Sequence, residues 1–180
     1  GTVTGRCSHK EPNLGNIPRR GPLGKRVRAL FTTIPGYSLV GADAKGLELR
    51  MLAHFIAAFD GGKYIKVVLE GDPHTFHMEM TDGIITDRDD SKTFIYAYIY
   101  GGGDGKLGLI VRHGVSVGRK LRRTFEKRFA ALSALKEAVA YKAKTQGWIK
   151  GLDSRQLHVR AVYSSLNTLL QSAGALVMKQ

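Results

Sequence analysis

Four side chains with complementary chemistry recur at every fourth position in the middle of the chain: Arg88, Lys92, Tyr96 and Tyr100. On an α-helix this spacing places them along one slowly turning ridge. The guanidinium and the ammonium group suit phosphates, and the two phenol rings suit stacking on a base. The ridge therefore indicates a site for a nucleotide or a nucleic acid strand, although a solvated basic stripe beside aromatic core residues would give the same pattern.

The helix that must carry this ridge has recognisable start and stop signals. Thr86 or Asp87 can cap its first turn, and the run of three glycines after the last tyrosine ends it. Phe94 and Tyr98 lie roughly on the opposite face, and we expect them to anchor the helix in the core. The sequence therefore predicts a helix over residues 87–100 with one ligand-binding face and one buried face.

A second candidate site lies where a predicted strand meets a predicted helix. Residues 37–43 read as a short buried strand that ends in Asp43. The apolar face of the helix that follows comprises Leu47, Met51, Leu52, Phe55, Ile56 and Phe59. A carboxylate at the end of a core strand can hold a divalent metal, and oxygen ligands favour Mg²⁺. The same placement also fits an ordinary helix cap, which is the commoner role of such an aspartate.

Composition and charge limit the class of protein and the kind of partner. The 180 residues are 43% hydrophobic, which is enough for a folded core in one domain or one domain with a lobe. A formal net charge of +13 at pH 7 favours a polyanionic partner, either nucleic acid or a membrane surface. The sequence has no apolar run long enough to span a bilayer, no visible signal peptide and a single cysteine, Cys7. These features fit an intracellular, reducing setting.

The spacing Arg-x3-Lys-x3-Tyr-x3-Tyr-Gly resembles the nucleotide-binding fingers helix of family A DNA polymerases, the DNA polymerase I family. The resemblance implies that Arg88 and Lys92 grip the triphosphate of an incoming nucleotide, with Lys92 also assisting the chemistry. It further implies that Tyr96 packs on the nucleotide's sugar and base, and that Tyr100 lies beside the templating base.

Two motifs in the N-terminal stretch, which is rich in Gly, Pro and Asn, extend the resemblance. Residues 4–8 and 12–18 are similar to the family's Thr-Gly-Arg-x-Ser and Pro-Asn-Leu-Gln-Asn-Ile-Pro signatures. The first implies that Arg6 reaches the minor groove at the primer terminus, where acceptors common to every base pair allow one arginine to check pairing shape. The second implies a template–primer contact by Asn13, while Gly15 replaces the family's usual glutamine and loses its contact.

Residues 43–54 resemble motif A of the same family, most closely its bacteriophage form Asp-Ala-Ser-Gly-Leu-Glu-Leu-Arg. The resemblance implies that Asp43 binds both catalytic metals and that the Ala44 carbonyl assists. It also implies that Glu48 is a steric gate against a ribose 2′-hydroxyl. Lys45 stands where the family usually has serine.

A further phosphate contact is suggested at the start of another predicted helix. Asp72 can cap this helix and Pro73 can occupy its first turn, which places His74 beside the helix N-terminus. Such a place can bind an anion, although a surface histidine is more often inert. The family has Asp-x-His-Thr or a close variant here, and the resemblance implies that His74 touches the triphosphate.

Several elements are predicted to frame these motifs. Short helices are expected near residues 64–69 and 105–112, and Ser116 is expected to cap a long helix whose basic side is read as a solvated face. The apolar side of that long helix comprises Leu121, Phe125, Phe129, Leu132 and Leu135. Residues 148–160 predict a hairpin that turns at Asp153-Ser154.

The C-terminal helix carries the last motif. Ser164 is predicted to cap it, and Asn167 and Gln171 share one face four residues apart. The run around them resembles the family segment whose Asn and Gln contact the minor groove of the primer-template, which implies that role for both residues. Tyr163 replaces the arginine of many bacterial members, so no contact is expected from it.

Together the motifs imply a helix-rich mixed α and β (α+β) fold, the palm and fingers of a family A polymerase. Palm parts are expected at residues 1–60, with the primer-contact motif and motif A, and at 148–180, with the hairpin and the minor-groove helix. The fingers are expected at residues 61–147. The implied activity is template-directed addition of dNTPs to a primer 3′ end in DNA replication, by two-metal nucleotidyl transfer with two Mg²⁺ ions.

The family's other catalytic carboxylate lies in a His-Asp motif that follows the last motif found here, and its thumb and exonuclease regions precede the first. We therefore expect a fragment that is inactive alone and that works with those missing segments, primer-template DNA and dNTPs. The expected setting is the cytoplasm, of the host cell if the protein is from a bacteriophage, with no membrane partner. The sequence leaves a processivity factor open.

Two alternatives remain from other classes. A non-catalytic nucleic-acid-binding module would explain the charge and the minor-groove residues, but it would not explain Glu48 beside Asp43. A single-subunit RNA polymerase fragment would share the palm and the Arg/Lys/Tyr ridge, but the gate at Glu48 favours deoxynucleotides.

Overall fold

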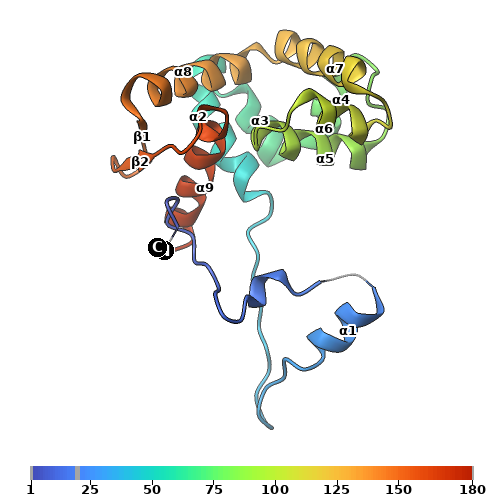
Figure 1. Cartoon of the computed structure of the whole chain (residues 1–180), viewed down its shortest axis with the longest axis vertical. Helices are drawn as coiled ribbons and strands as arrows, with labels where there is room; N and C mark the ends of the chain where they lie inside the picture. Colours follow the sequence, from blue (N-terminus) through green and yellow to red (C-terminus); the bar gives the residue numbers. More distant parts are fainter. Residues whose placement is uncertain (1, 19–20, 180) are drawn as a thin grey trace.

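Helices dominate the chain in the computed structural model, which describes residues 2–18 and 21–179 (Figure 1). The α-helices are α1 (Pro22–Arg28), α2 (Leu47–Asp60), α3 (Lys63–Glu70), α4 (Pro73–Glu79), α5 (Arg88–Ile99), α6 (Asp104–Ile110), α7 (Val115–Arg128), α8 (Ala130–Gln146) and α9 (Ser165–Val177). Strands β1 (Trp148–Lys150) and β2 (Gln156–His158) form an antiparallel hairpin, and η1 (Leu14–Asn16) and η2 (Val162–Ser164) are short 3₁₀ turns. The predicted helix-rich mixed class is confirmed.

Side-chain caps fix the two helices that begin near the candidate ligands. The Asp87 carboxylate accepts hydrogen bonds from the backbone N–H groups of Asp89 and Asp90, so Asp87, and not Thr86, caps α5. The Asp72 carboxylate likewise accepts the N–H of His74 at the start of α4. The start of both helices is therefore set by local sequence, as predicted.

The apolar core gathers around the inner face of α5. Phe94 and Tyr98 are fully buried, as predicted, and both pack against Phe125 of α7. The Phe94 and Phe125 ring centroids are 4.9 Å apart with the rings nearly perpendicular, an arrangement that aromatic pairs favour. Because these residues lie opposite the ridge, their burial directs the ridge outward.

The expected long helix from Ser116 is in fact two helices, so that prediction is wrong. Helix α7 begins at Val115 after Gly114, which leaves Ser116 inside the first turn. The chain leaves the helical conformation at Phe129, where φ is −111° and ψ is 61°. The Phe129 ring packs against Tyr64 and Phe76 at centroid distances of 5.1 and 5.3 Å, and this aromatic cluster accounts for the break.

The predicted buried strand at residues 37–43 is also wrong. This segment is irregular and exposed, with Tyr37 at 70% and Val40 at 92% relative exposure. A strand needs a neighbour to pair its backbone N–H and C=O groups. Within residues 2–18 and 21–179, the sheet consists of β1 and β2 alone, and neither lies beside this segment in Figure 1.

Residues 21–43 form an arm that extends away from the helical body (Figure 1). The arm contains α1, which was not predicted, although Pro22 at its first position after Gly21 is a recognisable start signal. On α2, Leu49, Leu52, Ala53 and Ile56 are buried. Phe59, which was predicted on the apolar face of this helix, lies in its last turn and is 45% exposed.

The hairpin and α9 complete the body. Strand β1 pairs with β2 in the register Trp148↔His158, and the chain turns between them at Asp153-Ser154, as predicted, with Ser154 at positive φ. Ser164 occupies the N-cap position of α9, but its hydroxyl donates to the Ala161 carbonyl and makes no cap bond. No helix in the part of the chain that the structure describes is long and apolar enough to cross a membrane.

Candidate active site

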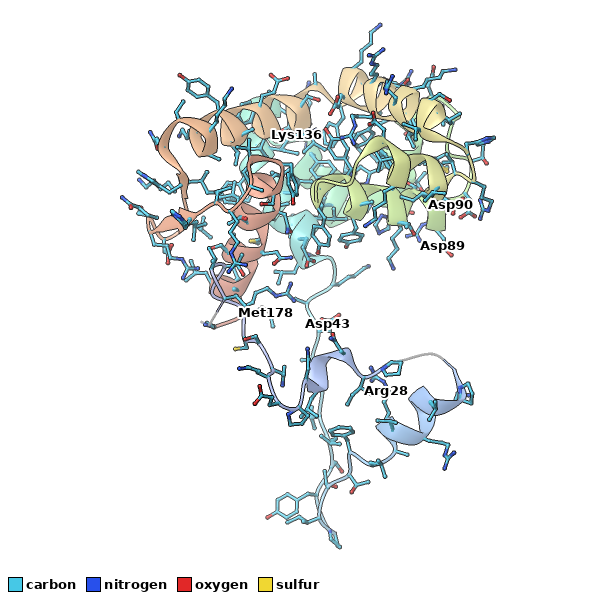
Figure 2. All side chains as sticks on the ribbon, in the orientation of Figure 1. Arg28, Asp43, Asp89, Asp90, Lys136 and Met178 are labelled. Carbon is cyan, nitrogen blue, oxygen red and sulfur yellow. The ribbon has the colours of Figure 1, made fainter. Side chains whose placement is uncertain are left out.

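A cavity of about 590 Å³ lies between the N-terminal segment, the start of α2, α5 and α9. Its wall includes seven of the residues that the motifs identify: Arg6, Asp43, Ala44, Glu48, Lys92, Tyr96 and Gln171. Figure 2 labels Asp43 and Met178, which line this cavity from segments that are far apart in the sequence. Four stretches that are far apart in sequence therefore converge on one concave site.

The predicted ridge on α5 exists and borders this cavity. Lys92 and Tyr96 line the wall, while Arg88 and Tyr100 are exposed one turn to either side. The Tyr96 ring centroid is 6.3 Å from that of Tyr100 and 6.4 Å from that of His74. The two cationic groups and the two phenols thus follow one another along the outer face of the helix.

Glu48 meets the tyrosines from the first turn of α2. The Tyr100 hydroxyl lies 3.5 Å from Glu48 Oε1, at the limit of a hydrogen bond. Burial raises the pKa of Tyr96 and of Tyr100, and the nearby Glu48 carboxylate raises both further. Both phenols therefore stay protonated at neutral pH and keep their hydroxyl groups as hydrogen-bond donors.

His74 and Arg88 are brought together at the far end of the ridge by Asp72. The Arg88 guanidinium donates from Nε to Asp72 Oδ2 at 2.6 Å and from Nη2 to Oδ1 at 3.0 Å. Burial, followed by the positive charge of Arg88, lowers the pKa of His74, which is therefore mostly neutral near pH 7. The sequence identified Asp72 as a helix cap and missed its pairing with Arg88.

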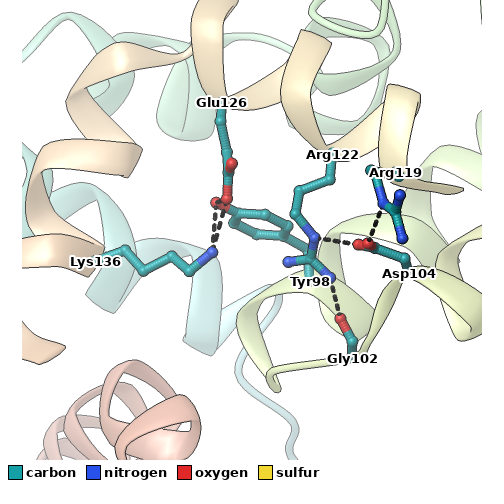
Figure 3. A network of polar contacts seen from close by, with 7 residues as sticks. All are labelled: Tyr98, Gly102, Asp104, Arg119, Arg122, Glu126 and Lys136. Carbon is teal, nitrogen blue, oxygen red and sulfur yellow. Dashed lines mark hydrogen bonds and ion pairs between the residues drawn. The ribbon is translucent and has the colours of Figure 1, made fainter.

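A polar network fixes the inner face of α5 to α7 and α8 (Figure 3). The Tyr98 hydroxyl donates to Glu126 Oε1 at 2.9 Å, and Lys136 Nζ donates to the same oxygen at 2.7 Å. Lys136 Nζ also lies 4.5 Å from the centre of the Tyr98 ring, within the range of a cation–π contact. This network was not predicted, because it joins residues up to 38 positions apart.

The same view shows how the loop after α5 is held (Figure 3). Arg122 of α7 donates from Nη2 to the Gly102 carbonyl and from Nε to Asp104 Oδ1, each at 2.6 Å. Arg119 reaches Asp104 Oδ2 at 3.5 Å. Arg119 and Arg122 on the basic side of α7 therefore hold the loop after α5 in place. The prediction that this basic side is a solvated face is wrong for these two residues.

Arg155 of the hairpin holds the N-terminal motif near α9. Its Nη2 donates to Ser172 Oγ at 2.8 Å and to the Thr4 carbonyl at 3.4 Å. A second cavity of about 540 Å³ lies beside this contact and shares Arg6 and Gln171 with the first. The two cavities thus form neighbouring parts of one surface, and sequence reasoning missed Arg155 as its support.

Five of the predicted site residues do not line the first cavity, namely His74, Arg88, Tyr100, Asn13 and Asn167, and the two asparagines also lie off the ridge. Asn13 is exposed just before η1, in the N-terminal segment, and does not line either cavity. Asn167 lies one turn before Gln171 on α9, and its side-chain oxygen is buried without a hydrogen-bond partner among the described residues. The roles predicted for both asparagines remain predictions.

The donor groups for a divalent metal are incomplete within the described residues. The Asp43 carboxylate and the Ala44 carbonyl are oxygen donors of the kind that Mg²⁺ prefers, and both residues line the cavity. No group of three or more His, Cys, Asp or Glu side chains gathers in residues 2–18 and 21–179. These residues fit part of an Mg²⁺ coordination shell.

Comparisons with known proteins identify the family and the fold of the chain. The model of DNA polymerase family A matches residues 1–179. The DNA-directed DNA polymerases of Escherichia phage T7 and Enterobacteria phage T3 are each 43% identical to the chain over 202 residues, which cover 99% of the chain and 28% of each relative. The DNA-directed DNA polymerase of Escherichia phage Phieco32 is 35% identical over 207 residues, 97% of the chain and 31% of the relative.

A solved structure shows the same fold. The POL domain of Pol1 from M. smegmatis, in complex with DNA primer-template and dNTP, superposes with a TM-score of 0.74 at 25% identity, over 99% of the chain and 34% of that domain. The fold is therefore that of a polymerase domain. The chain belongs to DNA polymerase family A, and it spans about 28% of the length of the phage relatives.

Proposed function

We propose that the chain is the palm and fingers part of a replicative DNA polymerase of bacteriophage type, which adds dNTPs to a primer 3′ end under the direction of a template. The observation that carries this proposal is the 590 Å³ cavity, because it collects residues from four separately identified motifs. The 43% identity to two phage DNA-directed DNA polymerases supports the same activity. The proposed palm comprises residues 1–60 and 148–180, and the fingers comprise residues 61–147.

In this proposal the ridge on α5 binds the incoming nucleotide. Arg88, Lys92 and His74 bind the triphosphate, because two cations and an imidazole lie along one edge of the site. Lys92 also meets the charge that develops on the phosphates during transfer. Tyr96 packs on the sugar and base, and Tyr100 lies beside the templating base.

The remaining wall selects the sugar and holds the primer-template. Glu48 lies beside Tyr96 and Tyr100, where its side chain would obstruct a ribose 2′-hydroxyl. Arg6 and Gln171 border both cavities and would read acceptors in the minor groove, with Asn13 and Asn167 as further contacts.

Family A DNA polymerases use divalent metal ions, and we propose Mg²⁺ here. When bound, Mg²⁺ would supply charge neutralisation at the triphosphate and activation of the primer hydroxyl. Asp43 and Ala44 would hold it from this chain, and a second carboxylate would come from the parts of the relatives that the chain does not span. Primer-template DNA, dNTPs and those parts, including the thumb, are the proposed partners, and the host cytoplasm is the proposed setting.

A chimeric enzyme tests the proposal. This chain would replace its counterpart in the phage T7 polymerase, and extension of a labelled primer would be measured with dNTPs and with rNTPs. We expect extension with dNTPs only, and no extension by the chain alone. Lys92→Ala should lower both kcat and dNTP affinity, and Asp43→Asn should lower kcat by about two orders of magnitude or more while DNA affinity is retained.

Control variants and the possible outcomes distinguish loss of the proposed site from a general loss of structure. Lys66→Ala on α3 removes one cation at a position that does not line the cavity and should leave extension unchanged. Normal extension by the Asp43→Asn chimera would refute the metal assignment. DNA binding without extension by the unmodified chimera would instead favour a binding module, and equal use of rNTPs would favour an RNA polymerase.

A further inference from the structure

The first cation of the ridge is held by a carboxylate from another helix. Arg88 and Asp72 form a two-point pair, with Nε–Oδ2 and Nη2–Oδ1 distances of 2.6 and 3.0 Å. This parallel geometry fixes the plane of the guanidinium as well as its position, which a single contact would not do. Asp72 lies at the start of α4 and Arg88 at the start of α5, so the pair joins the beginnings of two helices.

The same carboxylate fixes the backbone that carries His74. Asp72 Oδ1 accepts the His74 N–H at 3.1 Å, and Oδ2 accepts the Thr75 hydroxyl at 2.8 Å. A second bond between the helices runs from the buried Ser91 hydroxyl on α5 to the His74 carbonyl, at 2.7 Å. His74 and Arg88 are therefore held relative to one another through both a side chain and the backbone.

The pair leaves most of the guanidinium available to a ligand. Arginine has five N–H donors, and the bonds to Asp72 use two of them, so three can still bind phosphate oxygens. The hydrogen bond from Arg88 holds the pKa of Asp72 well below its usual range, so the carboxylate stays ionised throughout the neutral range. Asp72 can therefore orient Arg88 without occupying all of its binding capacity.

We propose that Asp72 is a positioning residue that holds Arg88 and His74 as one preorganised unit for the triphosphate of the incoming nucleotide. The inference rests on the proposed function, because it assumes that Arg88 and His74 bind the triphosphate. Asp72 touches neither substrate nor metal in this role. Because Asp72 already holds Arg88 and His74 in place, these two side chains lose less conformational entropy when the nucleotide binds.

The substitution Asp72→Asn separates this role from helix capping. Asparagine caps helices about as well as aspartate, so the N–H of His74 keeps an acceptor. The charged two-point contact with Arg88 is lost. In the chimeric polymerase we expect KM for dNTPs to rise about tenfold, the order set by loss of a charge-assisted hydrogen bond, while kcat changes by less than about threefold and DNA affinity is unchanged.

Asp90→Asn is the matched control. Asp90 accepts a hydrogen bond from Arg112 at 2.8 Å, so this variant also removes an aspartate–arginine pair that involves the first turn of α5. Figure 2 labels Asp90 at this end of the helix. Arg112 does not belong to the ridge, and KM for dNTPs should stay within about twofold of the unmodified enzyme.

A double-mutant cycle with Arg88→Ala tests whether Asp72 acts through Arg88. Most of the KM increase from Asp72→Asn should disappear in the Arg88→Ala background, which a general loss of structure would not produce. Thermal unfolding of each variant checks that the fold is retained.

An unchanged KM in the Asp72→Asn enzyme would overturn the inference. A lower KM would also overturn it, because Asp72 would then compete with the phosphates for Arg88. An equal KM increase with and without Arg88 would overturn it as well. An inactive unmodified chimera would refute the proposed function and the inference with it, whereas activity with an unchanged Asp72→Asn KM would refute the inference alone.

Discussion

The Tyr96 hydroxyl is a protonated donor at the wall of the cavity, since burial and Glu48 raise its pKa. A donor at this place can replace the 3′-hydroxyl of a nucleotide that lacks one. We therefore expect the chimeric polymerase to incorporate dideoxynucleotides readily. Tyr96→Phe should increase discrimination against them by about 10- to 100-fold, the range of one hydrogen bond to a charged group, while dNTP incorporation stays nearly intact.

The measurement is the ratio of kcat/KM for a dideoxynucleotide to that for the matching dNTP. Tyr100→Phe removes the neighbouring hydroxyl of the ridge, 6.3 Å away between ring centroids, and should leave this ratio unchanged. Equal ratios for the unmodified and Tyr96→Phe enzymes would show that Tyr96 does not lie where the proposal puts it.

At the scale of residues, spacing along the sequence predicted the ridge but not its supports. Helical periodicity alone places Arg88, Lys92 and Tyr96 on one face. The pairing of Arg88 with Asp72 depends on how α4 packs against α5, and no local pattern encodes that packing. The cavity likewise depends on the fold, although most of its polar lining could be identified from motifs.

At the scale of elements, α4 is tied to α3 through a buried histidine. His77 is fully buried, and its Nε2 lies 2.8 Å from the Tyr64 hydroxyl. Burial lowers the pKa of His77 to about 3, well below the ordinary value of 6.5. Between these two values the unfolded chain binds a proton at His77 that the folded chain does not bind. The neutral, buried His77 therefore contributes fully to the free energy of unfolding above about pH 6.5, and this contribution is lost as the pH falls toward 3.

We expect the free energy of unfolding to fall by up to about 1.4 kcal/mol per pH unit from this group between pH 6 and pH 4.5. Urea unfolding at several pH values measures the slope, and His77→Gln should flatten it. His9 is exposed in the N-terminal segment, and His9→Gln should leave the slope unchanged. An unaltered slope in the His77→Gln chain would mean that His77 takes up its proton without unfolding.

Helices were predicted better than the strand for a physical reason. A helix satisfies its backbone groups locally, and caps such as Asp72 and Asp87 mark its start in the sequence. A strand depends on a partner that the sequence pattern does not reveal, which is why the segment 37–43 was misread. The break at Phe129 was missed because it follows from contacts with distant rings.

At the scale of the whole molecule, we expect the net charge of +13 to govern the proposed binding to DNA. Phosphate contacts by Lys and Arg release counterions, so the logarithm of the affinity should fall linearly with the logarithm of salt concentration. Fluorescence anisotropy with a labelled primer-template should show at least about a tenfold loss of affinity between about 50 and 200 mM salt. A single strand of equal length should give a shallower slope, and an affinity independent of salt would contradict the proposed contacts.

The exposed arm has a consequence for the behaviour of the isolated chain in solution. Residues 34–42 contain no charged side chain, and residues 38–43 make no backbone hydrogen bonds among the described residues. An extended apolar segment with open N–H and C=O groups is a template for pairing between copies, and hence for aggregation. Repulsion between highly charged copies opposes that pairing, and salt screens the repulsion. The concentration at which the purified chain stays monomeric should therefore fall as salt is added, so the buffer that weakens DNA binding also favours self-association.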